Sequence, residues 1–321
     1  MARTDTVGTT LADTPELDAD VVVIGGGAAG LSAGAFLARY GLETLVLARG
    51  KSAIRQCAHL ENYLGFPGGV SPERFLALGR SQVEFEGGLV REELVETVER
   101  TDLPDHGDAG IGTRADGSDP DQGGFRVESD GRTYLTRYVL AATAYDGDMF
   151  EAFIEEVDTD AEYGFVDSDA GRTPIEGLYA AGWMTDETVH QVIVSAGHGA
   201  RAAISLVRDD LAARYWPAVA DHYVDWVVHE GRYAGDEEWE ADTRKWFERE
   251  VLVDGVDAET TEKAFDHLCS EFLDRMLDAD EVDQRNREGQ LQLLEHLDDD
   301  VVREYADGLD TARKEAISDH R

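Results

Sequence analysis

The sequence is poor in cysteine and has no long hydrophobic run. Its 321 residues include two cysteines, Cys57 and Cys269, which lie far apart and form no C-x-x-C pair. This excludes a dithiol redox centre of that type and a zinc knuckle, and no metal site is expected. Uncharged apolar runs stay well below the roughly 18 residues that cross a bilayer. The first 19 residues lack the regions of a signal peptide, so we expect a cytoplasmic protein that does not bind membranes.

Lysine is also scarce, and acidic residues dominate. Aspartate and glutamate number 68 against 29 lysines and arginines, which gives a formal net charge of −39. Nucleic acids and anionic membranes are therefore not expected as partners, because both select basic clusters. Acid excess with little lysine resembles the cytoplasmic proteins of extreme halophiles, since at about 1 M salt the screening length falls to about 3 Å. An acidic protein of ordinary salt tolerance is the alternative.

Local patterns predict an α/β unit followed by a helical one. Residues 1–18 are expected to be a disordered leader, and residues 101–123 an exposed turn region. From residue 209 onward glycine becomes rarer and tryptophans fall among charged, helix-favouring segments. The predicted strands are 21–24, 44–47, 124–129, 132–141, 164–167 and 177–181, and the predicted helices are 29–40, 72–86, 191–207, 258–277, 281–297 and 301–317.

A glycine-rich turn carries the clearest functional signal. Gly25, Gly27 and Gly30 form a G-x-G-x-x-G pattern that follows an apolar strand and opens a helix, with Ala28 and Ala29 inside it. Gly25 permits the tight turn, Gly27 lets backbone approach a pyrophosphate, and Gly30 allows close packing of helix on strand. A diphosphate would then lie at the helix N-terminus. The alternative is a turn whose glycines serve packing only.

The second predicted strand ends without an acidic residue. Dinucleotide folds that bind NAD usually place a carboxylate there for the ribose hydroxyl, and this chain has Ala48-Arg49 instead. This disfavours NAD(H) as the ligand. Arg49 is a candidate contact to a phosphate or an adenine, and a surface arginine is the alternative.

Two further segments give the pattern a family resemblance. Residues 57–68 (CAHLENYLGFPG) resemble the E-N-[WFY]-x-G-x-P loop of low-molecular-weight thioredoxin reductases. Residues 181–192 (AGWMTDETVHQV) resemble the A-G-D…R-Q-A segment of that family. The resemblance covers roughly residues 20–207. It implies an α/β fold: a Rossmann-like, three-layer FAD-binding domain with a mainly parallel sheet, a small antiparallel meander and, in this chain, an α-helical C-terminal extension.

The resemblance also implies cofactor contacts. Asn62 would offer its amide to the polar edge of the isoalloxazine, and Gln191 and Val192 would open a helix whose N–H groups face the flavin. Thr143 and Gly182 stand in the turns that flank the cofactor in the family. The family's aspartate after Ala-Gly is Trp183 here, so Asp186 is the candidate for the ribityl contact.

Candidate catalytic residues are Cys57 and His190. Cys57 lies in the loop expected beside the flavin and would form a charge-transfer or mixed-disulfide species; the alternative is a small buried thiol. His190 replaces an arginine of the family and would act as base or proton donor, with a solvated or packing histidine as the alternative. Small residues at Ser195, Gly197 and Gly199 either leave room for a cofactor or serve helix packing.

One short interval limits the function. Thr143 and Gly182 are separated by the 38 residues 144–181, whereas thioredoxin reductases have an NADPH-binding domain there. Domains start at about 50 residues, so a second nucleotide domain does not fit. We therefore expect an FAD-binding domain at 19–208, made of two sequence halves, and a helical extension at 209–321.

The functional prediction is an FAD-dependent oxidoreductase. Its electrons would come from an external donor, a ferredoxin or a thiol partner, instead of bound NADPH. The alternative is a non-catalytic flavin or nucleotide sensor or scaffold. A third hypothesis is a single-site NAD(H)-binding protein. The extension is expected to cap the flavin domain or to offer a docking surface, with a homodimer left open.

Overall fold

The computed structural model describes residues 18–49, 52–103, 123–144, 147–153, 170–223, 227–229 and 237–309. The expected leader lies outside these residues except for Asp18, as do most of the expected turn region 101–123 and all of the expected strand 164–167. The third C-terminal helix, expected over 301–317, spans Asp299–Gly308 in the structure, and residues beyond 309 lie outside the described ones.

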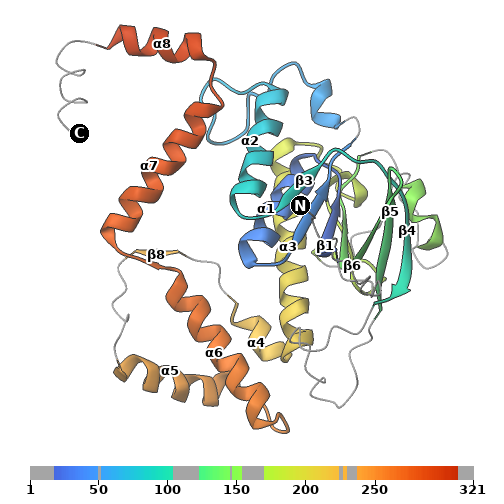
Figure 1. Cartoon of the computed structure of the whole chain (residues 1–321), viewed down its shortest axis with the longest axis vertical. Coiled ribbons are helices and arrows are strands. Elements are labelled where there is room, and N and C mark those ends of the chain that lie inside the picture. Colours follow the sequence, from blue (N-terminus) through green and yellow to red (C-terminus); the bar gives the residue numbers. More distant parts are fainter. Residues whose placement is uncertain are drawn as a thin grey trace, which may run out of the picture.

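A seven-stranded mixed sheet forms the centre of the fold (Figure 1). Strands β3, β2, β1, β6 and β7 are mutually parallel in that order, and β6 also pairs antiparallel with β5, which pairs with β4. The parallel part and the antiparallel meander both agree with the predicted fold class. The strands are β1 (Ala19–Ile24), β2 (Thr44–Leu47), β3 (Leu89–Arg91), β4 (Val95–Asp102), β5 (Gly123–Ser129), β6 (Arg132–Ala141) and β7 (Leu178–Ala180).

Both faces of the parallel strands β1, β2 and β7 and of the end of β6 are buried, which is why these segments read as continuous apolar runs. On one face Val21 and Val23 of β1 pack against helices α1 (Ala28–Tyr40), α2 (Pro72–Phe85) and α3 (Val192–Arg214). On the other face Val22 and Ile24 pack against β4, β5 and the 3₁₀ helix η2 (Asp148–Phe153). Helices, parallel sheet and meander therefore form three layers, as predicted.

The predicted turns and caps are present. Gly41 ends α1 in the left-handed conformation (φ 96°), and its N–H donates to the carbonyl of Ala38. The Ser71 hydroxyl accepts the Arg74 N–H at 3.2 Å and caps α2. Asp130 and Gly131 both have positive φ and close the β5–β6 hairpin, as a two-residue turn of this type requires.

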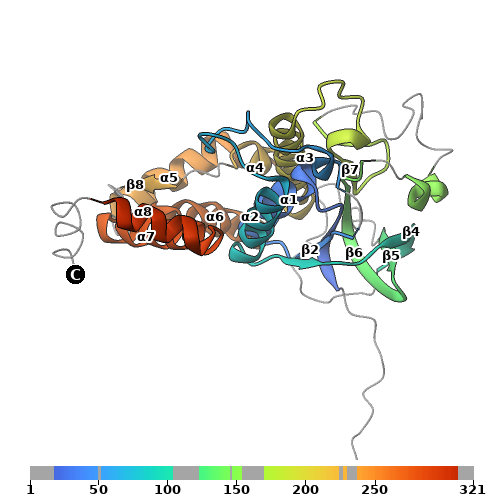
Figure 2. The same ribbon diagram turned by 90° about the horizontal axis from the view of Figure 1, so that it is seen from above.

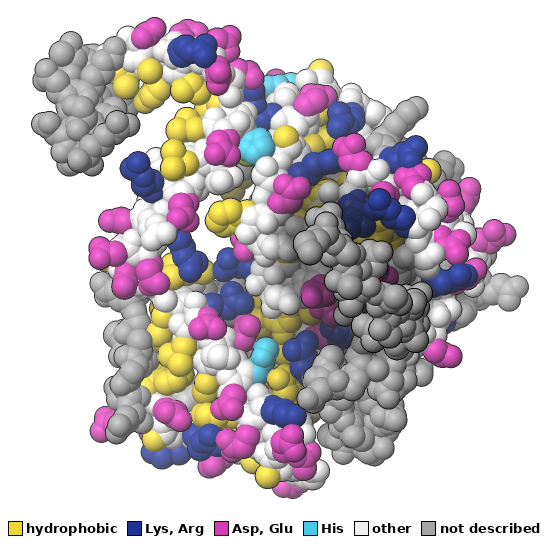
Figure 3. Space-filling view, viewed as in Figure 1, with side chains coloured by type: hydrophobic (Ala, Val, Ile, Leu, Met, Phe, Trp, Pro, Cys, Tyr) yellow, Lys and Arg dark blue, Asp and Glu magenta, His cyan; other side chains and the backbone are white. Residues whose placement is uncertain are grey.

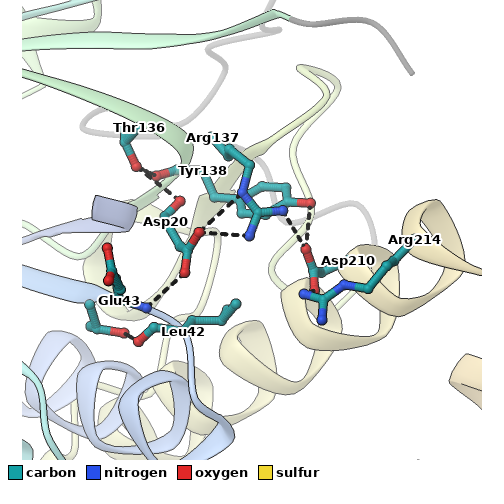
Figure 4. Close-up of polar contacts among 9 residues, drawn as sticks. Asp20, Leu42, Glu43, Thr136, Arg137, Tyr138, Asp210 and Arg214 are labelled. Carbon is teal, nitrogen blue, oxygen red and sulfur yellow. Dashed lines mark hydrogen bonds and ion pairs between the residues drawn. The ribbon is translucent and has the colours of Figure 1, made fainter. Parts of the chain in front are cut away.

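A buried ion network fixes the C-terminal part of α3 to the sheet (Figure 4). Asp210 is 1% exposed and accepts from Arg137 at 2.7 Å, Arg214 at 2.6 Å and the Tyr138 hydroxyl at 3.2 Å. Arg137 also donates to Asp20 of β1. Burial alone lowers the pKa of Arg137, but the carboxylates of Asp210 and Asp20 more than offset this and raise it. The network joins α3, β6 and β1, so it holds the helix that reaches the site at its other end.

The boundary expected at residue 208 falls within α3, which continues to Arg214. The following helices lie beyond α1–α3, on the side away from the strands (Figures 1 and 2). They have a small core of their own around Trp216, whose indole N–H donates to the Val251 carbonyl at 2.7 Å. The elements are α4 (Pro217–Asp221), β8 (Val228–His229), α5 (Glu237–Glu250), α6 (Ala258–Asp274), β9 (Met276–Leu277), α7 (Ala279–Glu295) and α8 (Asp299–Gly308).

Helices α7 and α8 form an arm with no buried residue. The arm meets α2 through a hydrogen bond between Ser81 and His296 (2.8 Å) and an ion pair between Arg74 and Asp298 (2.8 Å). Hydrophobic side chains gather along it in Figure 3, while acidic side chains are spread over the visible face. Among the described residues, no helix is long and apolar enough to cross a membrane.

Candidate functional site

The main cavity lies at the carboxyl edge of the parallel strands. It has a volume of about 420 Å³ and is lined by the ends of β1 and β2 and by the turns after β6 and β7. Open α/β sheets bind ligands at this edge, where loops from several strands converge. The first turns of α1 and α3 also line it. The lining residues are 24–29, 47–49, 52–54, 57, 93–95, 142–144, 149, 182–183, 190–192 and 195, so segments far apart in the sequence contribute to one pocket.

Two glycines of the predicted motif are required by backbone packing. Gly25 has φ +119°, and a Cβ there would overlap the carbonyl of Ala142. A Cβ on Gly30 would overlap the carbonyl of Gly25. Gly27 differs, because a Cβ there would meet only the Ser52 hydroxyl at 3.6 Å. Gly27 thus leaves open space in the cavity directly at the N-cap of α1.

The two helix ends that face the cavity have no acidic residue in their first turns. Helices α2, α6, α7 and α8 carry acidic residues there, whereas α1, α3 and the short helix α4 carry none. A helix N-terminus has free N–H groups and a partial positive charge, which acidic side chains normally neutralise. At α1 and α3 the free N–H groups and the partial positive charge remain available to a ligand. The arrangement suits an anionic or electron-rich group, such as a diphosphate or a flavin carbonyl.

Arg49 lies at the β2 end of the pocket. Its guanidinium donates to Asp130 at 2.6 Å, so the hairpin turn holds it at the pocket edge. The Asp130 carboxylate accepts hydrogen bonds from the Leu94 N–H and from Arg49. Both contacts lower its pKa, and the bond from Leu94 has the larger effect. The side chain of Arg49 is 54% exposed. This placement is compatible with the predicted ligand contact and with the surface alternative.

Asn62 and Gln191 are brought together from 129 residues apart. The Asn62 amide donates to the Gln191 side-chain oxygen at 2.7 Å. Gln191 is the N-cap residue of α3 and lines the pocket with Val192. The two segments that carry the family resemblance therefore meet at the mouth of one cavity. Asn62 is not among the lining residues, and this bond connects it to the lining residue Gln191.

Cys57, His190, Thr143 and Gly182 all line the cavity. Cys57 is exposed, so the alternative of a small buried thiol does not apply. His190 stacks on Trp183, with ring centroids 4.5 Å apart. Asp186 is exposed and is not among the lining residues, so the structure does not support the predicted ribityl contact.

The stripe of small residues on α3 has two different roles. Ser195 lines the pocket, but a Cβ on Gly199 would overlap the carbonyl of Ala29. Gly199 therefore serves the close crossing of α1 and α3, which is the packing alternative. Gly197 has open space around it and touches neither helix α1 nor the pocket lining. His198 forms a contact with Glu187 at 3.3 Å.

Several lining residues were missed in the sequence. Glu93 and Leu94 follow β3, a strand of three residues that is too short for a pattern. Glu93 is held by the Tyr134 hydroxyl at 2.7 Å and by Arg132 at 2.8 Å. Met149 enters from η2. The only available signal was topological: loops after parallel strands share one edge.

The pocket fits a flavin adenine dinucleotide in shape and in donor type. Sheet order places β2 and β7 three strand spacings apart, or about 14 Å, with the α1 N-terminus between them. An elongated ligand can thus place its diphosphate at Gly27 and its two ring systems toward Arg49 and Trp183. The lining is mostly apolar, as ring systems require.

Comparison with known proteins agrees with this fit. Residues 18–58 match the FAD binding domain family. A 90-residue stretch is 37% identical to the thioredoxin reductase of Aquifex aeolicus, and it spans 27% of this chain and 28% of that protein. These matches indicate FAD as the cofactor. The chain therefore corresponds to less than a third of the length of the curated relative it matches.

Solved structures with a similar arrangement include two thioredoxin reductases. The one from Gloeobacter violaceus has a TM-score of 0.49 at 15% identity and covers 66% of this chain and 100% of its own. The one from T. acidophilum has a TM-score of 0.46 at 19% identity and covers 61% of this chain and 100% of its own.

Proposed function

We propose that this protein is an FAD-dependent oxidoreductase that takes electrons from an external donor, a ferredoxin or a thiol partner, and has no nicotinamide site of its own. The proposal extends to a cytoplasm of high salt, which the charge of −39 and the scarcity of lysine favour. The central element of the proposal is that this chain lacks the NADPH-binding domain of thioredoxin reductases.

The direct pairing of β6 with β7 carries the proposal. Val139, Leu140 and Ala141 pair in parallel with Leu178, Tyr179 and Ala180, so the two sequence halves close one sheet. Residues 144–181 connect them, and Met149, Phe150 and Phe153 of that connection are buried against the meander. Part of the short connection is thus already used in the core. What remains is far below the roughly 50 residues of a domain.

The residues around the cavity have distinct roles in this proposal. The α1 N-terminus at Gly27 would bind the diphosphate, and the α3 N-terminus at Val192 would stabilise negative charge near the pyrimidine edge. Bound FAD supplies hydride or single-electron exchange. The exposed thiol of Cys57 lines the same cavity and is available to a thiol substrate or disulfide. His190, also in the lining, would hold or transfer a proton.

A visible spectrum in molar KCl tests the proposal. The purified full-length protein should be yellow, or should become yellow with added FAD. Reduced ferredoxin or a small dithiol should then bleach the oxidised-flavin band, and NADPH alone should leave it unchanged. Stoichiometric bleaching by NADPH alone would contradict the proposal, because it requires a nicotinamide site.

A non-catalytic flavin sensor or scaffold is the second candidate. The replacement of the family's aspartate by Trp183 and the lack of a C-x-x-C pair favour it. The same spectra separate the two functions. A sensor would bind FAD but would react with protein and thiol donors no faster than free FAD does.

A further inference from the structure

Two aromatic rings pack against each other in the lining of the cavity. Trp183 follows β7 in the 3₁₀ helix η3 (Gly182–Met184), and His190 precedes α3. Their ring centroids are 4.5 Å apart and their planes are tilted by 32°. Both residues line the cavity that holds the glycine-rich turn. The pair therefore borders the ligand space at the β7 side of the pocket.

The pair stands on a loop that its own side chains organise. The Thr185 hydroxyl donates to the Gly182 carbonyl at 2.8 Å and receives the Glu187 N–H at 3.3 Å. Glu187 in turn accepts the Val189 N–H at 2.7 Å and contacts His198 of α3 at 3.3 Å. These contacts tie both ends of the loop to β7 and α3. His190 is thus placed against Trp183 by a built support.

We propose that the Trp183–His190 pair is an aromatic platform for the isoalloxazine end of bound FAD, and that Trp183 replaces a carboxylate contact with a stacking contact. The inference rests on FAD binding as proposed above. An indole has one N–H donor and no acceptor, so it cannot accept hydroxyl groups of the ribityl chain as an aspartate does. Its contribution is contact area and ring geometry.

The position of the pair selects one end of the cofactor. Arg49 and the hairpin turn lie on the β2 side of the pocket, and Trp183 lies on the β7 side, about 14 Å away by strand spacing. Asn62 and Gln191, bonded to each other at 2.7 Å, lie on the same side as Trp183. These two amides suit the polar edge of the isoalloxazine, so the adjoining platform contacts that ring system.

Substitutions at Trp183 test the platform through FAD binding and flavin emission, in full-length protein and molar KCl. W183A should weaken the Kd for FAD about 5- to 150-fold, since removing an aromatic partner from a stacked base costs about 1–3 kcal/mol. W183F should keep the Kd close to that of the wild type. It should also raise the fluorescence of bound flavin, because an adjacent indole quenches flavin emission by electron transfer and phenylalanine does not.

The chain offers a matched control in a second tryptophan–histidine pair. Trp246 and His222 lie 5.0 Å apart in the helical extension and do not line the cavity. W246F should change neither the Kd nor the emission of bound flavin. Because W183F retains an aromatic ring, it keeps the test valid if W183A fails to fold.

Three results would overturn the platform. They are an unchanged Kd for folded W183A, unchanged flavin emission in W183F, and a W183D variant that binds FAD more tightly than the wild type. In each case the wild type still binds FAD, so the proposed function is unaffected. A wild type that refuses FAD would instead refute the proposed function itself.

Discussion

Removing the Asp210 carboxylate should destabilise the fold far more than removing its neighbour Asp209. Asp210 is 1% exposed and neutralises Arg137 and Arg214, whose side chains are 16% and 27% exposed. Asp209 is 39% exposed, binds Arg172 at 2.7 Å and also accepts the hydroxyl of buried Tyr179 at 2.7 Å. The two residues are consecutive on α3, so chain position is matched. Replacing Asp209 by asparagine removes its charge and keeps an oxygen that can accept the Tyr179 hydroxyl.

The expected magnitudes follow from what each substitution leaves behind. D210A leaves two guanidinium groups largely buried without their shared acceptor, which typically costs about 3–5 kcal/mol. We expect the lower end, about 3 kcal/mol, because both arginines keep partial contact with water and Arg137 retains Asp20. D209N breaks a partly exposed ion pair while keeping an acceptor for the Tyr179 hydroxyl, and should cost at most about 1 kcal/mol.

Urea unfolding of both variants measures the difference, and urea leaves ionic strength unchanged. The free energy of unfolding should be compared at low salt and in molar KCl. The loss in D210A should persist in KCl, because a buried pair is screened little, whereas any loss in D209N should shrink. Equal losses in the two variants, or a D210A loss that disappears in KCl, would refute the view that the network is a buried anchor for α3.

Three further predictions use other parts of the structure. G199A should separate α1 from α3, since a Cβ would overlap the Ala29 carbonyl, and should weaken FAD binding as seen by ultrafiltration. At pH 8 a thiol reagent should label exposed Cys57 well before Cys269, because burial raises the pKa of the Cys269 thiol to about 11. Added FAD should protect Cys57 from the reagent. Mass spectrometry measures the labelling of each cysteine. Burial lowers the pKa of His267, so its contribution to stability is lost as pH falls below about 6.5. In H267F the midpoint of urea unfolding should therefore fall less steeply with pH in that range. Equal labelling of both cysteines, or an unchanged pH slope in H267F, would count against these assignments.

The sequence predicts well those elements whose signals are local. The strand at β1, the glycine turn after it and the Asp130-Gly131 hairpin each depend on residues within a few positions of one another. Helix α3 is correct in its start at Gln191 but extends seven residues past the expected end at Val207. Its continuation is stabilised by Asp210, whose partners Arg137 and Tyr138 on β6 are remote in the sequence.

Elements decided by remote contacts were harder to predict. Strand β3 has three residues, two of them half-buried and one exposed, and exists because it pairs in parallel with β2. Glu93 and Leu94 enter the pocket only because that strand ends at the shared edge. Asp186 shows the opposite case, since a residue of suitable chemistry and nearby position is exposed and is not among the lining residues. Short spacing in the sequence does not determine which side of a loop faces a cavity.

The site follows from the way the two sequence halves close one sheet. Strand β7 pairs with β6 directly, so Gly182 and Trp183 line the same cavity as Gly25 and Ala142. The N-terminus of α3 is then fixed by the same closure, because Gly199 packs on Ala29 of α1. An inserted domain would have to leave and re-enter between β6 and β7 without disturbing this geometry. In the proposed function, the 38-residue connection leaves this pocket without a nicotinamide domain of its own, and for that reason we propose an external electron donor as the partner.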